Sequence, residues 1–276
     1  MITKPIQSIN IQPISKLVGG LRLEGSVKAP THDRPLISII TVVFNGEHFL
    51  EETIKSVIYQ SYFNFEYIII DGGSTDGTLE IILKYEHLLD YWVSERDQGI
   101  YDAMNKGIEL ATGDWINFMN AGDWFITDSV LFSFFQDKSY SCTQILYGNH
   151  EVRDPSGKRL IKKAGHEKNL WRGSQFCHQA VFVNAKYHKI NKFNDETKIV
   201  ADFEFFYWAY KNKAKFIKTD VVVVSYAAGG ISDKRRVRSL IDRWGVVDKS
   251  LGTNLVYIKY LIVEILKLAI KKILQK

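Results

Sequence analysis

Three aspartates stand where a carboxylate could act on a ligand. Asp71 closes the apolar run FEYIIID and is followed by Gly72 and Gly73. A carboxylate here can accept hydrogen bonds from a nucleobase imide or a ribose hydroxyl, and the glycines let the backbone approach the ligand. Alternatively, Asp-Gly-Gly-Ser forms only a tight turn, in which Ser74 or Asp76 caps the next helix.

Asp123 follows a second apolar run, in FMNAGDW, next to the small residues Ala121 and Gly122. Mg²⁺ and Mn²⁺ retain several waters and bridge phosphate oxygens, so one or two protein carboxylates are enough to hold them. Asp123 is therefore a candidate metal ligand. The alternative is that it caps a helix expected at 125–136.

Asp202 lies in IVADFEFF, where a helix is expected to begin. Such an aspartate could be a helix N-cap. It could also be a general base that takes the proton of an attacking sugar hydroxyl. Spacing along the chain does not separate these two interpretations.

The elements that must position these residues alternate between strand and helix in the first half of the chain. The pattern predicts strands at 36–44, 65–71, 91–95 and 114–120, and helices at 47–60, 78–88 and 99–111. This alternation is typical of a parallel sheet with helices on both faces. Ligands bind beyond the carboxyl ends of such strands. The four loops there should share one sheet edge and form the site: 44–46, 71–77, 96–99 and 120–123.

The second half is less regular. We expect a hairpin formed by 144–152 and 158–164 around the turn Asp154-Pro155-Ser156-Gly157. A strand at 176–184, a helix at 201–213 and a strand at 215–227 follow. Residues 254–276 carry apolar positions through several turns and predict an amphipathic helix.

Composition limits the class of protein. The 276 residues are 46% hydrophobic and 24% charged, as in an ordinary globular chain. The two cysteines, Cys142 and Cys177, fit no metal-binding spacing or disulfide framework, which favours a reducing compartment. We expect neither a signal peptide nor a spanning helix, because no apolar stretch has the required length. The net charge of +5 is concentrated near the C-terminus, in a cluster of Lys234, Arg235, Arg236, Arg238 and Arg243.

Taken in order, the motifs resemble those of the inverting family 2 glycosyltransferases with the GT-A fold. The resemblance covers about residues 35–230, through SIITVVFNG, IIIDGGSTDGT, SERDQGIYDAMNKGIELATGDWINFMNAGDWF, CHQAVF and IVADFEFF. It implies an α/β fold with a mostly parallel central sheet flanked by helices. We expect a lead-in at 1–34 and a catalytic domain at 35–230, followed by a basic, amphipathic helical segment at 231–276. The resemblance divides the catalytic domain into a nucleotide-binding half (35–125) and an acceptor half (126–230).

The resemblance also assigns the site residues. Asp71 matches the aspartate that contacts the base, usually uracil, and Asp123 matches the metal-binding motif. Asp202 matches the proposed catalytic base. His178 and Gln179 match a strand beside the acceptor cleft, where a lone histidine is as readily structural as functional. The positions that match the family's nucleotide-binding elements are Thr41, Val43, Asn45, Asp71, Ser74, Asp102, Asn105 and Lys106.

Two departures from the family pattern concern charge. Asn120-Ala-Gly-Asp123 keeps one acid where the family often has two or three, so the expected Mg²⁺ or Mn²⁺ would be held mainly by water and phosphate. Met104 replaces a common arginine, for which Lys106 or Arg96 could substitute.

The implied activity is that of an inverting hexosyl- or N-acetylhexosaminyl-transferase. Its expected donor is a UDP-sugar, and its acceptor a saccharide or an undecaprenyl-diphosphate-linked saccharide in surface polysaccharide (O-antigen, capsule or colanic acid) synthesis. The alternative is a nucleotide-binding or nucleotidyl-transferring α/β domain that moves no sugar, although TVVFNGEHF lacks the usual basic phosphate loop. A dinucleotide-binding fingerprint is missing after the first strand, and no aromatic-basic motif indicates nucleic acid.

The C-terminal helix predicts a peripheral place on the inner face of the bacterial cytoplasmic membrane. Its apolar stripe, with lysines around it, is typical of an interfacial helix: Leu255, Ile258, Ile262, Ile265, Leu266, Ala269 and Ile273. The alternative is docking against the catalytic domain or a second subunit. The sequence does not determine the oligomeric state.

Overall fold

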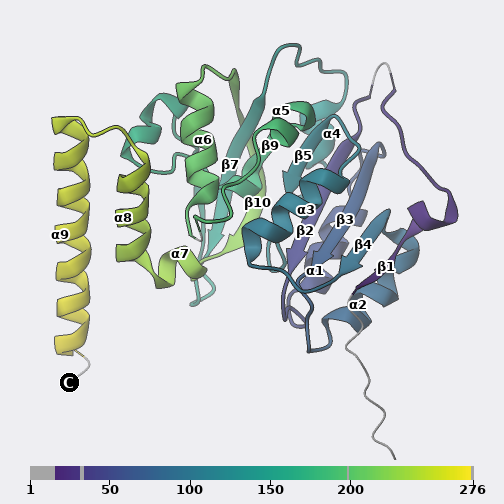
Figure 1. Cartoon of the computed structure of the whole chain (residues 1–276), viewed down its shortest axis with the longest axis horizontal. Coiled ribbons are helices and arrows are strands. Elements are labelled where there is room, and N and C mark those ends of the chain that lie inside the picture. The colour runs from purple at the N-terminus through teal and green to yellow at the C-terminus, as the bar shows by residue number, and fades with distance from the viewer. Residues whose placement is uncertain (1–15, 32–33, 198, 275–276) are drawn as a thin grey trace, which may run out of the picture.

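One mixed sheet organises the molecule (Figure 1). The computed structural model describes residues 16–31, 34–197 and 199–274. The strands run in the order β1-β4-β3-β2-β5-β9-β7-β10-β6, with β8 paired to β7. Their bounds are β1 Leu17–Gly19, β2 Ile37–Val43, β3 Phe65–Asp71, β4 Tyr91–Ser94, β5 Trp115–Phe118, β6 Trp124–Phe125, β7 Ile145–Arg153, β8 Arg159–Lys162, β9 Val181–Asn184 and β10 Phe216–Ala227.

The neighbouring strands β4, β3, β2 and β5 are parallel, as the alternating pattern predicts. The helices are α1 Leu50–Ile58, α2 Thr78–Tyr85, α3 Ile100–Leu110, α4 Val130–Phe135, α5 Ala185–Ile190, α6 Ala201–Lys211, α7 Ile231–Lys234, α8 Arg236–Val246 and α9 Leu251–Leu274. Short 3₁₀ turns lie at Leu21–Glu24, Glu86–Leu88, Glu167–Arg172 and His178–Ala180. The predicted α/β fold with a mostly parallel central sheet is confirmed.

Successive residues of β2 point to opposite faces of the sheet, which explains why the strand is apolar throughout. Ile39 belongs to a buried cluster with Ile54 of α1 and with α2. Ile40 belongs to the cluster on the other face, under α3. Gly107 lets α3 approach the sheet, because a Cβ there would lie 2.6 Å from Cγ2 of Ile40. The helices therefore cover both faces.

Two predicted boundaries are wrong, and both lie near the candidate site. The helix expected at 125–136 begins only at Val130, because Trp124 and Phe125 pair with β10 as strand β6. The strand expected at 176–184 begins at Val181, because His178–Ala180 form a 3₁₀ turn. In both places tertiary pairing and a local turn overrule the apolar pattern of the sequence.

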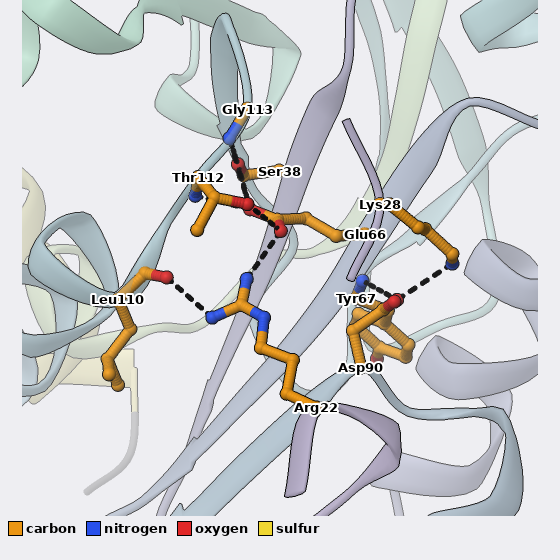
Figure 2. Close-up of polar contacts among 9 residues, drawn as sticks. All are labelled: Arg22, Lys28, Ser38, Glu66, Tyr67, Asp90, Leu110, Thr112 and Gly113. Carbon is orange, nitrogen blue, oxygen red and sulfur yellow. Dashed lines mark hydrogen bonds and ion pairs between the residues drawn. The ribbon is translucent and has the colours of Figure 1, made fainter. Parts of the chain in front are cut away.

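Part of the N-terminal lead-in extends the sheet. Strand β1 pairs antiparallel with β4, and the 3₁₀ turn Leu21–Glu24 follows it. Figure 2 shows Arg22 of this turn reaching Glu66 on β3, while a second nitrogen of its guanidinium donates to the carbonyl of Leu110 at 2.7 Å. Nearby, Lys28 pairs with Asp90 at 2.9 Å. Residues 16–28, here called the N-terminal strap, are thus held to the edge of the sheet by three ion pairs, the third between Lys16 and Glu95 at 3.4 Å.

Glu66 is the centre of this network and is almost completely buried. It accepts hydrogen bonds from the hydroxyl of Ser38 at 2.5 Å and from the amides of Thr112 at 2.6 Å and Gly113 at 3.2 Å (Figure 2). Burial alone would raise the pKa of Glu66, but these hydrogen bonds and the charge of Arg22 hold that pKa below its ordinary value. The carboxylate thereby joins the strap, the sheet and the end of α3.

The last two helices form a hairpin at one side of the molecule, with α9 outermost (Figure 1). Tyr257 of α9 is buried, and its ring lies parallel to that of Trp244 of α8, with centroids 6.2 Å apart. The Trp244 indole also donates to Asn254 at 2.9 Å. Beyond these contacts the apolar side chains of α9 are exposed, among them Ile262, Ile265, Leu266, Ile270 and Ile273. None of the helices in the described part of the chain combines the length and apolar character that crossing a membrane requires.

Candidate active site

The loops after the parallel strands meet at one edge of the sheet, as the sequence predicts. Asn45 follows β2 in the left-handed conformation, with φ of 50°. Its amide donates to the hydroxyl of Ser74 at 2.7 Å, and its side-chain oxygen accepts from the amide of Thr75 at 2.9 Å. Gly72 lies against the next loop, since a Cβ there would be 2.3 Å from a carboxylate oxygen of Asp97.

Asp71 lies at the end of β3 and is fully buried. Its carboxylate accepts from the hydroxyls of Ser74 and Ser94, both at 2.5 Å, and from the Ser74 amide at 3.1 Å. The tight turn that the sequence offers as an alternative is therefore formed. A carboxylate has about four acceptor positions, so these hydrogen bonds do not use up its capacity, but the side chain is buried beneath the Ser74 turn.

Thr41 and Val43 do not present their side chains at the surface of this edge. The Thr41 hydroxyl donates to the carbonyl of Met119 at 2.7 Å and lies 2.9 Å from the Tyr67 hydroxyl. Thr41 and Val43 therefore stabilise the end of β2 from inside the protein and offer no side chain to a ligand. Phe44, which lies between Val43 and Asn45, is 62% exposed. Sequence reasoning missed Phe44, although an aromatic side chain between a buried strand and a ligand-edge loop is the signal for a stacking surface.

Helix α3 is tied to the same edge by its polar residues. Asp102 accepts from the Gln98 amide at 2.9 Å and pairs with Lys106 at 3.3 Å. Lys106 also reaches Glu95, at 3.2 Å. Asn105 exchanges two hydrogen bonds with the backbone of Phe193, at 2.9 and 3.0 Å. Of these three predicted nucleotide-binding residues, Asn105 and Lys106 thus tie α3 to neighbouring segments, while the contacts of Asp102 stay at the start of the helix.

Asp123 is 8% exposed and does not cap a helix, since Ser129 occupies the N-cap position of α4. Its carboxylate accepts from the Gln179 amide group at 2.7 Å and from the Ala227 backbone at 3.3 Å. Burial raises the pKa of Asp123 to about 6. A buried carboxylate whose pKa is raised in spite of its hydrogen bonds is stabilised by a nearby cation.

The loop around Asp123 offers oxygen donors and few other ligands. The buried side-chain oxygen of Asn120 has no hydrogen-bond partner among the described residues. Within that same part of the chain, no group of three or more His, Cys, Asp or Glu side chains could hold a metal ion. One carboxylate and one amide oxygen fit a hard cation that takes its remaining ligands from water and phosphate. They do not form a closed metal cage.

Asp202 is the second residue of α6, and Val200 rather than Asp202 occupies the N-cap position. Its carboxylate faces the sheet edge, where it accepts from the Tyr101 hydroxyl at 3.0 Å and lies 3.2 Å from Nδ1 of His178. Burial opposes ionisation, but the His178 hydrogen bond and the charges of His178 and Arg243 lower the pKa of Asp202. Because Val200 holds the N-cap position and the carboxylate contacts Tyr101 and His178, Asp202 is not a simple helix cap.

The consecutive residues His178 and Gln179 connect the two carboxylates. His178 contacts Asp202 through Nδ1, and its Nε2 lies 3.1 Å from the Asn120 side chain. Gln179 donates to Asp123. The 3₁₀ turn at His178–Ala180 makes this possible, since it directs adjacent side chains toward α6 and toward the Asn120–Asp123 loop. The geometry places a carboxylate able to take a proton and a carboxylate able to attract a cation in one connected polar site.

Comparison with known proteins decides the family. The sequence model described as "Glycosyl transferase family 2" matches residues 38–215. The chain belongs to this family. A "PGL/p-HBAD biosynthesis glycosyltransferase" from Mycobacterium bovis is 30% identical to this family 2 glycosyltransferase over 217 residues, which are 72% of the chain and 80% of the relative. An uncharacterized glycosyltransferase from Haemophilus influenzae is 33% identical over 168 residues, or 58% of the chain and 66% of the relative.

Solved structures agree with the GT-A fold of this family 2 glycosyltransferase. The mannosyltransferase PcManGT from Pyrobaculum calidifontis, in complex with GDP-Man and Mn²⁺, aligns with a TM-score of 0.60 and 16% identity over 85% of this chain and 71% of that protein. S. aureus TarS 1-349, in complex with UDP-GlcNAc, aligns with a TM-score of 0.57 and 17% identity over 82% and 71% of the two chains. At these identities the likeness establishes the fold.

Proposed function

We propose that this glycosyltransferase moves a hexosyl or N-acetylhexosaminyl group from a UDP-sugar to a saccharide acceptor by inverting displacement. The observation that carries the proposal is the Asp202 carboxylate, held by Tyr101 and by His178, whose neighbour Gln179 holds Asp123. Asp202 takes the acceptor hydroxyl proton while the acceptor oxygen bonds to the anomeric carbon. The bond from that carbon to the diphosphate breaks, and UDP leaves with the electron pair.

The donor nucleotide is assigned to the edge formed by the loops after β2 and β3. Phe44 offers an exposed ring for stacking on the base. Asp71 and Ser74 supply polar groups for the base or ribose, and Asn45 holds the Ser74 turn in place. Met104, which is uncharged and buried, stands at the position where the family often has arginine, so no charge is supplied there.

Mg²⁺ or Mn²⁺ is the proposed cofactor, with Asp123 as its main protein ligand. When bound, the cation would neutralise charge on the departing diphosphate. Asp123 and the free oxygen of Asn120 would hold it, which leaves most ligand positions to water and the diphosphate. The Mn²⁺ found with GDP-Man in PcManGT supports this cofactor class.

We place the acceptor in surface polysaccharide synthesis, as a saccharide free or linked to undecaprenyl diphosphate. The chain then divides into a nucleotide-binding half at 35–125 and an acceptor half at 126–230. His178 and Gln179 belong to the acceptor half but point at Asp202 and Asp123, so we assign them the positioning of these two carboxylates.

A thermal-shift and turnover panel tests the proposal. With Mn²⁺ present, UDP or a UDP-sugar should raise the melting temperature, because only ligands of the folded state stabilise it. The same panel should reveal one nucleotide-sugar whose hydrolysis or transfer the protein catalyses. In Asp123→Asn the stabilisation that Mn²⁺ adds to UDP should disappear, while Asp137→Asn, an exposed control, should keep it. Binding of UDP without turnover of any sugar donor would instead support the nucleotide-binding alternative.

We also propose that α9 binds the inner face of the cytoplasmic membrane. Its exposed apolar residues extend from Leu255 to Ile273, beyond the part that docks on α8. Lys259 and Lys267 are exposed on the same helix, and this combination of apolar and cationic side chains suits anionic lipid. The alternative, docking of α9 on the rest of the protein, applies to the first turns of this helix, where Thr253 and Tyr257 are buried.

Flotation with vesicles tests this association. The full chain should float with vesicles containing anionic phospholipid, whereas a chain truncated after residue 260 should remain at the bottom of the gradient. Truncation at this point preserves the Trp244–Tyr257 contact, so the folded domain serves as its own control. Equal flotation of the two forms would contradict a lipid-binding role for α9.

A further inference from the structure

A cavity of about 390 Å³ lies beside Tyr101, one of the two residues that hold the Asp202 carboxylate. It is lined by the start of α3, by Asp195 and Ile199 ahead of α6, and by Lys234 and Arg235 after β10. Tyr101 is one of its walls; the Tyr101 hydroxyl donates to Asp202 at 3.0 Å and also lies 3.2 Å from the Ile199 carbonyl oxygen. Because Tyr101 both lines the cavity and contacts Asp202, an acceptor bound in this cavity would lie next to the proposed base.

The cationic wall of the cavity differs from the rest of the basic C-terminal cluster. Arg236 pairs with Asp233 at 3.4 Å and with Glu264 at 3.7 Å, and Arg238 pairs with Asp242 at 2.9 Å. For Lys234 and Arg235, the two that line the cavity, no ion pair is found within the described residues. The two charges facing the cavity are therefore available to an anion.

The acidic residues of the cavity do not cancel its attraction for an anion. Asp102 is already engaged by Lys106 and by the Gln98 amide. Asp195 is exposed and suits the hydroxyl groups of a sugar, because a carboxylate accepts hydrogen bonds. Together the lining offers one carboxylate that can accept hydrogen bonds from sugar hydroxyls and two cations that can bind an anion. That combination matches a sugar that carries a phosphate.

We propose that Lys234 and Arg235 bind a phosphate or diphosphate group on the acceptor. This inference rests on the proposed function and names the chemical class of its acceptor: a phosphorylated sugar, soluble or lipid-linked. The Asn45, Asp71 and Asp123 positions assigned to the donor do not line this cavity; of the predicted nucleotide-binding residues Asp102 does, and its carboxylate is paired with Lys106. The cationic pair lies in the short connection between β10 and the α8–α9 hairpin (Figure 1).

The test uses the full chain with its donor site filled by saturating UDP and Mn²⁺. Glucose 1-phosphate and N-acetylglucosamine 1-phosphate are titrated by calorimetry, with methyl glucoside as the uncharged comparison. The phosphorylated sugars should bind more tightly than methyl glucoside. The double variant Lys234→Ala/Arg235→Ala should weaken their binding about 10–100-fold, because charge-assisted hydrogen bonds are lost. The control Arg238→Ala removes a paired charge outside the cavity and should bind like the wild type.

Each outcome has a defined meaning. If UDP fails to bind in the first step, the proposed function itself fails. If UDP binds but the sugar phosphates bind no better than methyl glucoside, or bind the double variant equally well, the phosphate site is overturned. Loss of UDP affinity in the double variant would also overturn it, since the cations would then serve the donor. A parallel titration with a polyprenyl diphosphate in detergent distinguishes the sources: tighter binding assigns the site to a lipid-linked acceptor, and equal binding to a soluble sugar phosphate.

Discussion

Asp202→Asn should lower the transfer rate by about 10²–10⁴-fold, the usual contribution of a positioned general base. Asparagine has the shape of aspartate and can still accept from the Tyr101 hydroxyl, so α6 should keep its place. It cannot take the proton of the acceptor hydroxyl. The affinity for UDP should therefore remain close to that of the wild type, because Asp202 does not belong to the Asn45–Asp71 edge.

The matched control is Glu204→Gln, two residues further along α6. Glu204 makes one long hydrogen bond, 3.4 Å from the Asn194 side chain, and none to the candidate site. Transfer rates measured at saturating donor, together with UDP titration, separate catalysis from binding. Wild-type turnover by Asp202→Asn would remove Asp202 from the mechanism, and an equal loss in Glu204→Gln would indicate general damage to α6.

Glu66→Ala should lower the free energy of unfolding by about 3–5 kcal/mol, the effect of removing one partner from a buried ion pair. The variant leaves the Arg22 guanidinium without its carboxylate partner and removes the acceptor of the Ser38 hydroxyl and the Thr112 amide (Figure 2). Urea unfolding measures the change. Glu109→Ala, which removes an exposed glutamate paired with Lys192, is the control and should have little effect.

The same carboxylate predicts how stability depends on pH. The pKa of Glu66 is lowered by folding from its ordinary value of 4.5, so its contribution is complete above that value. The contribution is lost as the pH falls through the lower pKa of the folded state. Glu66→Ala should therefore unfold with a weaker acid dependence than the wild type. If the two unfold with the same stability at neutral pH, the Glu66 network contributes no net stability and the prediction is wrong.

The two carboxylates of the site depend on each other through a single turn of the chain. Because His178 and Gln179 are adjacent, a shift of the turn that contains them would move the partners of Asp202 and Asp123 together. Arg153 adds a second restraint, since it donates to the Gly122 carbonyl at 2.5 Å and its guanidinium stacks on the Trp124 ring. The loop that presents Asp123 is thus fixed from two directions.

The sequence alone determined the parallel core of the fold. Apolar runs such as 65–71, separated by amphipathic helices and glycine-containing turns, are compatible with few arrangements other than a doubly covered parallel sheet. The same topology predicts that Asn45, Asp71 and Asp97 meet at one edge, because parallel strands end together. Local patterning was sufficient there, since each element follows directly from its own residues.

Tertiary structure decided what the polar residues do. Nothing in the spacing of Asp202 distinguishes a helix cap from a base, but packing of α6 beside α3 sets it against Tyr101 and His178. The strap of residues 16–28, which has no clear pattern, gains its place through pairing with β4 and through Arg22. Such contacts join residues far apart in the chain, so they are set by packing rather than by local pattern. For Asp71 and Asp123 the position at the sheet edge was predictable; the hydrogen-bond partners and the burial of all three aspartates required the fold.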